Sequence, residues 1–124
     1  LRRLIMGAGL RDIAPKEVYS VPITKEWSGD TNAYAVVDIS ALHPNESSKK
    51  IVVINFFYTN NSVNSMTFKS GTTALTGAMI TQASGIVKGN YNPDGHFKTA
   101  AGEDLNIVPS ANAVIGGWLN YYLE

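Results

Sequence analysis

Residues 90–106, NYNPDGHFKTAAGEDLN, hold the side chains of this sequence best suited to a metal site. In an EF-hand calcium loop the oxygen ligands alternate, and a glycine makes the sharp turn. The first half of that order is present in Asn90, Asn92, Asp94 and Gly95. The second half departs from it, because Ala101 occupies the place of the bidentate glutamate. We therefore expect neither a metal nor another cofactor.

A hydrolytic triad would have to take its imidazole base from His43 or His96, the two histidines of the chain. Cysteine nucleophiles and thiolate metal sites are excluded, because the chain has no cysteine. His43 precedes a proline in a polar, turn-forming run, where an exposed loop side chain is expected, and His96 follows a turn glycine. No nucleophile-elbow motif accompanies either histidine. We therefore expect no enzymatic activity.

A structural interpretation accounts for the same polar residues. Asn92, Pro93, Asp94 and Gly95 match the residue preferences of the four positions of a type I turn. Gly102 predicts a second turn a few residues later. The segment then forms two corners that lead into a strand.

Composition limits the possible partners. Ten Lys+Arg balance ten Asp+Glu, so the electrostatic attraction that drives binding to nucleic acid or to anionic membranes is missing. The longest apolar run, residues 51–58, is shorter than the roughly 20 residues that span a bilayer. We expect neither nucleic acid nor membrane as a partner. The low charged fraction of 16% favours self-association.

Apolar residues alternate with a period of two along most of the chain after residue 15, which is typical of half-buried strands. Eight segments separated by turn clusters predict strands, namely 17–23, 33–40, 50–60, 65–70, 77–83, 85–91, 103–110 and 114–123. Pro22 and Pro109 belong at sheet edges or strand ends, since proline cannot donate to a ladder. The pattern predicts an all-β fold, an antiparallel β-sandwich or jelly roll of about eight strands, with a small closed barrel as the alternative.

The first fifteen residues do not follow this alternation. We predict an extended N-terminal arm over residues 1–15 and a single β-sandwich domain over residues 16–124. The arm carries apolar side chains that could pack on a neighbour, although a frayed terminus with a few docked side chains fits as well.

The segment 50–60, KIVVINFFYTN, is apolar on both of its predicted faces. It is expected to be a central strand, or a strand whose outer face a partner covers. Together with the arm and the last strand, it supplies the candidate interface residues Leu4, Ile5, Leu10, Ile51, Val53, Phe57, Trp118 and Tyr122. Trp27, Trp118 and six tyrosines could instead form a stacking platform for carbohydrate, but aromatic residues at strand spacing more often belong to a core or interface.

The segment 70–122 resembles the C-terminal half of small structural proteins of tailed bacteriophages. Those proteins carry an apolar strand, Asn-Pro-Asp-Gly, an aromatic residue, Thr-Ala-Ala-Gly-Glu, a Leu-Asn strand and a closing Gly-Gly strand. The matching residues are Asn92, Pro93, Asp94, Gly95, Phe97, Thr99, Ala100, Ala101, Gly102, Glu103, Leu105, Asn106, Gly116 and Gly117. His96 departs from the tryptophan or tyrosine, and Asp104 from the alanine, often found in that family.

The resemblance implies a virion component without enzymatic activity. The role that fits best is a capsid decoration, or cement, protein, which would bind the major capsid protein on the outer surface of the capsid, bridge capsomers and assemble as a homotrimer. The alternative is a receptor- or glycan-binding module of a phage tail or fibre.

Overall fold

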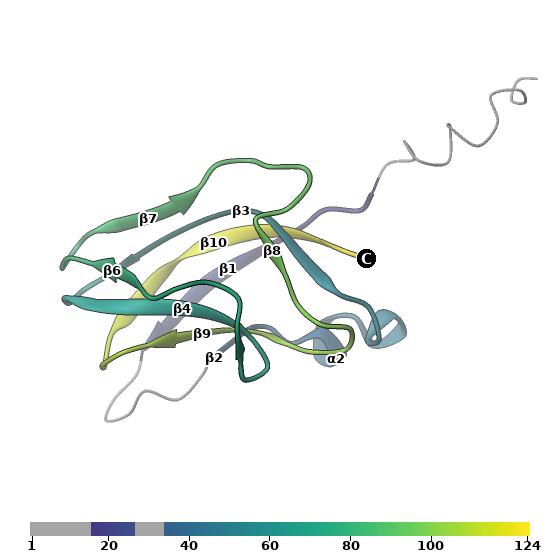
Figure 1. Ribbon diagram of the computed structural model, residues 1–124, viewed down its shortest axis with the longest axis horizontal. Helices are drawn as coiled ribbons and strands as arrows, with labels where there is room; N and C mark the ends of the chain where they lie inside the picture. The colour runs from purple at the N-terminus through teal and green to yellow at the C-terminus, as the bar shows by residue number, and fades with distance from the viewer. Residues whose placement is uncertain (1–15, 27–33) are drawn as a thin grey trace, which may run out of the picture.

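The computed structural model describes residues 16–26 and 34–124 (Figure 1). The predicted arm, residues 1–15, and Trp27 lie outside the described residues. The elements are β1 (Tyr19–Glu26), β2 (Tyr34–Val37), α2 (Ile39–Leu42), the 3₁₀ helix η1 (Pro44–Glu46), β3 (Ile51–Asn60), β4 (Asn64–Ser70), β5 (Thr73–Ala74), β6 (Met79–Thr81), β7 (Ile86–Gly89), β8 (Phe97–Lys98), β9 (Leu105–Pro109) and β10 (Val114–Leu123). All eight predicted strands are present, and β5 and β8 are additional. No helix among the described residues is long and apolar enough to cross a membrane.

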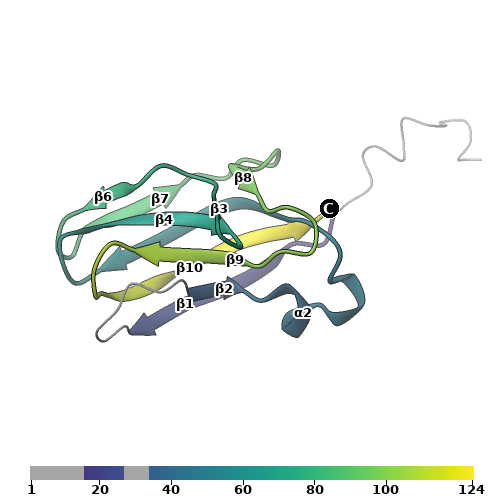
Figure 2. The same ribbon diagram turned by 60° about the horizontal axis from the view of Figure 1, so that its bottom comes forward.

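The strands form two antiparallel sheets that pack as two layers (Figures 1 and 2). Sheet A has the order β1-β10-β3-β7, with β8 also paired to β3, and sheet B has the order β2-β9-β4-β5, with β6 also paired to β4. If the eight longest strands are numbered one to eight along the chain, sheet A reads 1-8-3-6 and sheet B reads 2-7-4-5. This order is that of a jelly roll, so the predicted fold class is confirmed.

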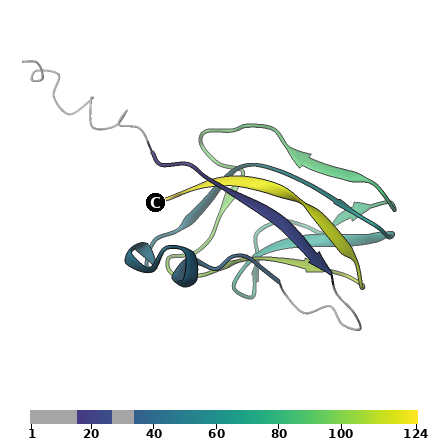
Figure 3. The same cartoon turned by 180° about the vertical axis from the view of Figure 1, so that it is seen from behind.

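The two prolines lie where a missing N–H is tolerated. Pro22 belongs to β1, the edge strand of sheet A seen from behind in Figure 3, and Pro109 is the last residue of β9.

The core fills the space between the sheets with aromatic and branched side chains. Phe68 of β4 lies at its centre and contacts Phe56, Tyr58 and Phe97, with ring centroids 5.3, 6.1 and 4.9 Å away. Both Phe68 and Tyr58 are fully buried. Because Phe56 and Tyr58 come from sheet A and Phe68 from sheet B, these contacts hold the layers together.

A short helix replaces the end of the second predicted strand. Alternation predicted a strand as far as Ser40, but the chain leaves β2 at Val37 and forms α2. The Asp38 carboxylate caps this helix by accepting from the Ala41 amide, 3.2 Å away. Asp104 accepts from the Ile39 amide at 2.9 Å. The prediction of strand at residues 38–40 is wrong, because these two carboxylates stabilise the first turn of a helix.

A β-bulge in β3 changes which side chains face the core. Val53 pairs with Tyr121 and Asn55 pairs with Asn120, so Ile54 is an extra residue on β3. Before the bulge the core-facing residues have odd numbers, and after it they have even numbers: Ile51, Val53, Phe56 and Tyr58 all belong to the main core. The predicted alternation fails at this residue.

Two adjacent glycines of β10 test the packing of sheet A. A Cβ on Gly117 would lie 2.6 Å from the Tyr58 Cα and against the Phe57 carbonyl oxygen, whereas a Cβ on Gly116 has no atom within 4 Å. We expect Gly117→Ala to lower the free energy of unfolding by about 2 kcal/mol or more, since backbone atoms cannot move aside. The control Gly116→Ala should be neutral or stabilising by up to about 1 kcal/mol. Urea unfolding of both variants checks this, and equal effects would contradict the register of β3 and β10.

Candidate functional site

Residues 90–104, called the strap below, carry the chain from sheet A to sheet B between β7 and β9 (Figure 1). Its first corner is a β-turn closed by the Gly95 amide, which donates to the Asn92 carbonyl at 2.9 Å. The Asn92 amide group is used inside the turn, because its Oδ1 accepts from the Asp94 amide and its Nδ2 donates to the Gly95 carbonyl. Gly95 has a φ of +92°. The predicted turn at residues 92–95 is confirmed.

The second corner of the strap lies over residues 100–103. The Glu103 amide donates to the Ala100 carbonyl at 3.2 Å, and Gly102 adopts a φ of +78°. The Gly102 amide donates to the Lys49 carbonyl at 2.9 Å. Gly102 is therefore a turn residue, as predicted, and it also ties the strap to the segment before β3.

The polar side chains at the end of the strap satisfy buried backbone and side-chain groups. The buried Thr99 hydroxyl accepts from the Ile51 amide at 2.8 Å. The buried Ser70 hydroxyl donates to Glu103 at 2.5 Å and accepts from the Ala100 amide at 2.9 Å. Since an unpaired polar group inside a protein is costly, these contacts explain the polar residues without invoking a ligand. Among residues 16–26 and 34–124, no group of three His, Asp or Glu is placed to hold a metal ion.

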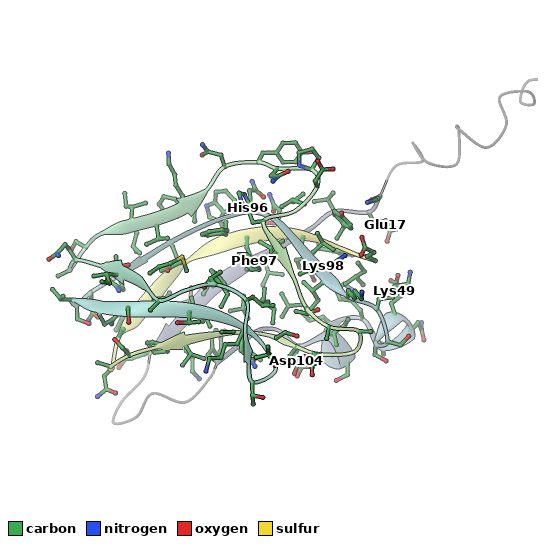
Figure 4. The ribbon with its side chains drawn as sticks, in the orientation of Figure 1. Glu17, Lys49, His96, Phe97, Lys98 and Asp104 are labelled. Carbon is green, nitrogen blue, oxygen red and sulfur yellow. The ribbon has the colours of Figure 1, made fainter. Side chains whose placement is uncertain are left out.

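Both histidines make contacts within the fold. Figure 4 shows His96 on the strap beside Phe97, whose ring lies between the layers. His96 Nε2 lies 2.5 Å from the Asn90 carbonyl oxygen, and its ring meets Phe56 edge-on with centroids 5.6 Å apart. Both contacts are internal to the fold.

His43 differs from its prediction as an exposed loop residue, because it is half-buried. Its ring lies 4.4 Å from that of Tyr19, and its Nε2 lies 2.6 Å from the Tyr121 hydroxyl. Burial raises the pKa of Tyr121 to about 12, so this hydroxyl stays protonated at neutral pH. The pair joins the end of α2 to β10.

The outer face of sheet A carries an accessible row of side chains across four strands. The register places Pro22, Trp118, Phe57 and Lys88 side by side on β1, β10, β3 and β7. The rings of Trp118 and Phe57 stack with centroids 6.0 Å apart and planes 10° apart. Trp118 is 41% exposed, so this aromatic row faces solvent.

A small hollow lies beside the aromatic row. It has a volume of about 150 Å³, and its lining includes Asn55, Trp118, Lys88 and Tyr91. Tyr91, at the start of the strap, is 68% exposed. The Oδ1 atom of Asn55 is buried and has no hydrogen-bond partner among the described residues.

The structure divides the predicted interface residues into three groups. Leu4, Ile5 and Leu10 lie outside the described residues. Ile51, Val53 and Tyr122 are buried within the chain, so their prediction as interface residues is corrected: the bulge at Ile54 turns Ile51 and Val53 into the core, and Tyr122 packs with Val52 and Ile54. Phe57 is half-buried and Trp118 exposed, and these two do share an accessible face.

Sequence reasoning found Trp118 and Phe57 but not their neighbours Asn55 and Tyr91. Trp118 and Phe57 are 61 positions apart in the sequence, and only the pairing of β10 with β3 brings them into contact. Asn55 follows the bulge, where alternation no longer tells which face a residue occupies. No local sequence signal could have assigned it to the hollow.

No protein-family model matches the chain, and no curated protein matches it. Among solved structures, it is similar to the coat protein of tobacco streak virus, a structure described as a coat protein dimer. The identity is 15%, the TM-score is 0.46, and the match covers 84% of each chain. A similarity at this level says nothing about function, so the functional proposal has to rest on the residues of this chain.

The strap can be tested by a pair of adjacent substitutions. We expect Gly95→Val to lower the free energy of unfolding by about 2 kcal/mol or more, because a β-branched residue is strained at a φ of +92°. Its Cβ would also lie 2.5 Å from the Val52 side chain. The control His96→Ala should stay within about 1 kcal/mol of the wild type, since it removes an exposed side chain. Thermal melts check this, and equal destabilisation would contradict the structural role of the turn.

Proposed function

We propose that the chain is a non-enzymatic virion structural protein, and more specifically a capsid decoration protein that binds the outer shell and bridges capsomers. The resemblance to phage structural proteins supports this proposal. Its residues include Asn92, Gly95, Thr99 and Gly102, which form the two corners of the strap and bind it to β3. A segment of this kind marks a shared scaffold, because these residues determine where the chain crosses between sheets.

The observation that carries the proposal is an apolar surface at β1, the edge strand that follows residues 1–15 in the sequence. Val18 and Leu42 are 56% and 53% exposed. A groove of about 310 Å³ lies here, lined by Tyr19, Ser20, Val21, Pro22, Leu42, His43 and Tyr121. An accessible edge strand with apolar neighbours is suited to contact another chain. We infer that this surface and the arm contact the major capsid protein and other copies in a homotrimer.

The mechanism would be binding linkage. A protein that binds the assembled lattice but not free capsomers stabilises the lattice by its own binding free energy at each site. At a free concentration one hundred times the dissociation constant, this amounts to about 2.7 kcal/mol per site. No chemical step is required, and the balance of ten basic and ten acidic residues is compatible with attachment through apolar contacts.

We expect the purified protein to co-sediment with bare capsids of the virus whose genome carries it, and to raise their melting temperature. Leu42→Gln should weaken co-sedimentation, because it places an amide in the apolar contact. The matched control Ile80→Gln alters a side chain that is 79% exposed on β6 of sheet B, and it should bind like the wild type. A protein that stays monomeric by light scattering at high concentration and fails to co-sediment would refute the proposal.

A further inference from the structure

We propose that the outer face of sheet A binds a pyranose ring of a surface glycan, stacked on Trp118 and hydrogen-bonded by Asn55. This site is centred on β10 and β3 and adjoins the surface at β1 proposed for shell attachment, because Pro22 lies beside Trp118 and also lines the groove there. The inference does not depend on where the protein sits in a particle.

The first argument is the aromatic platform. Trp118 is held parallel to Phe57, at 10° between ring planes, and yet it remains 41% exposed. The face of an aromatic ring is electron-rich and attracts polarised C–H groups. A pyranose presents a flat patch of C–H groups on one side of its ring, so a fixed and accessible indole is a suitable surface for it.

The second argument is the chemistry on either side of the aromatic row. One neighbouring row contains Ser20, Asn120 and Asn55, and the other contains Thr24, Gly116, Thr59 and the exposed Ile86. Apart from Gly116 and Ile86, these rows offer hydroxyl and amide groups, and they carry no charged side chain. Such groups pair with the hydroxyls of a polyol, whereas an apolar protein partner would leave them unsatisfied.

The third argument is the unpaired acceptor. Asn55 is one of the residues that line the hollow with Trp118 and Tyr91, and its Oδ1 is buried and has no hydrogen-bond partner among the described residues. Buried acceptors are nearly always paired, and a ligand hydroxyl in the hollow would supply the missing partner once the Asn55 amide turns toward it. A sugar hydroxyl would satisfy it while the ring stacks on Trp118.

The size of the hollow restricts the ligand. A volume of about 150 Å³ is smaller than the roughly 300–1,000 Å³ of sites for drug-sized molecules, so a single ring fits. Among the described residues of its lining, Lys88 is the one that carries a charge, and it is exposed. Its ammonium could donate to a sugar hydroxyl or to the carboxylate of an acidic sugar, and the test has to distinguish the two.

The test starts from the full chain with Trp27→Phe, so that Trp118 is the only tryptophan. Its fluorescence is titrated with neutral hexoses, N-acetylhexosamines and uronic acids, and the labelled protein is applied to a glycan array. We expect saturable binding to at least one of these classes. A preference for uronic acids that disappears in Lys88→Gln would identify an acidic sugar, and unchanged binding in that variant would identify a neutral one.

Three variants connect the binding to the site. Asn55→Ala should weaken sugar binding about tenfold, the factor expected for one hydrogen bond, without lowering the unfolding midpoint, because it removes an acceptor that has no partner. Trp118→Ala, assayed on the array, should abolish binding. The control Ile80→Ala, on sheet B, should change neither the sugar binding nor the unfolding midpoint.

The proposal is overturned if no sugar class binds, or if binding persists in both Asn55→Ala and Trp118→Ala. It is also overturned if Trp118→Ala converts an oligomer into monomers and no sugar binds, since the row would then be a contact between copies. If Trp118→Ala fails to fold, Asn55→Ala decides by itself. Loss of capsid co-sedimentation with intact sugar binding would refute the attachment proposal and leave this inference standing.

Discussion

The extra residue Ile54 in the central strand β3 is the constraint on which the rest of this jelly roll depends. β3 pairs with β10 on one side and with β7 and β8 on the other. Within such a paired strand, a bulge is needed to change which face of the sheet a given set of alternate side chains occupies. The bulge directs Ile51 and Val53 into the core before it and Phe56 and Tyr58 after it. The opposite face is thereby divided into a buried cluster of Val52, Ile54 and Tyr122 and an accessible row that contains Phe57.

The strap is adapted to this irregular strand. Its amides at Asn92 and His96 donate to the carbonyls of Ile54 and Val53, the two residues at the bulge. Gly95 approaches Val52 so closely that a side chain would collide with it. A segment that must follow a bulged strand needs tight turns and short polar side chains, and the same residue types compose metal sites. This is why residues 90–106 resemble a site in the sequence and act as a corner in the fold.

The two proposed surfaces lie toward opposite edges of sheet A. The groove around Leu42 and Tyr19 is at the β1 edge, whereas the hollow around Asn55 and Tyr91 is on the side of β3 and β7. The two surfaces meet at Pro22, which lines the groove and pairs with Trp118. Jelly rolls serve both as capsid and as lectin domains, so the fold is compatible with both roles. The choice between the roles therefore depends on the residues of the two surfaces.

The sequence by itself determined the all-β class, all eight main strands and the turns at Gly95 and Gly102, because period-two alternation and turn chemistry act over a few residues. It failed at residues 38–40, where a carboxylate from Asp104, far along the chain, stabilises a helical turn. It also failed at Ile51 and Val53, since a bulge arises from the pairing of two strands and leaves no local pattern. Only the tertiary structure placed Trp118 beside Phe57 and Asn55 in the adjoining hollow, because that arrangement depends on register between strands distant in sequence.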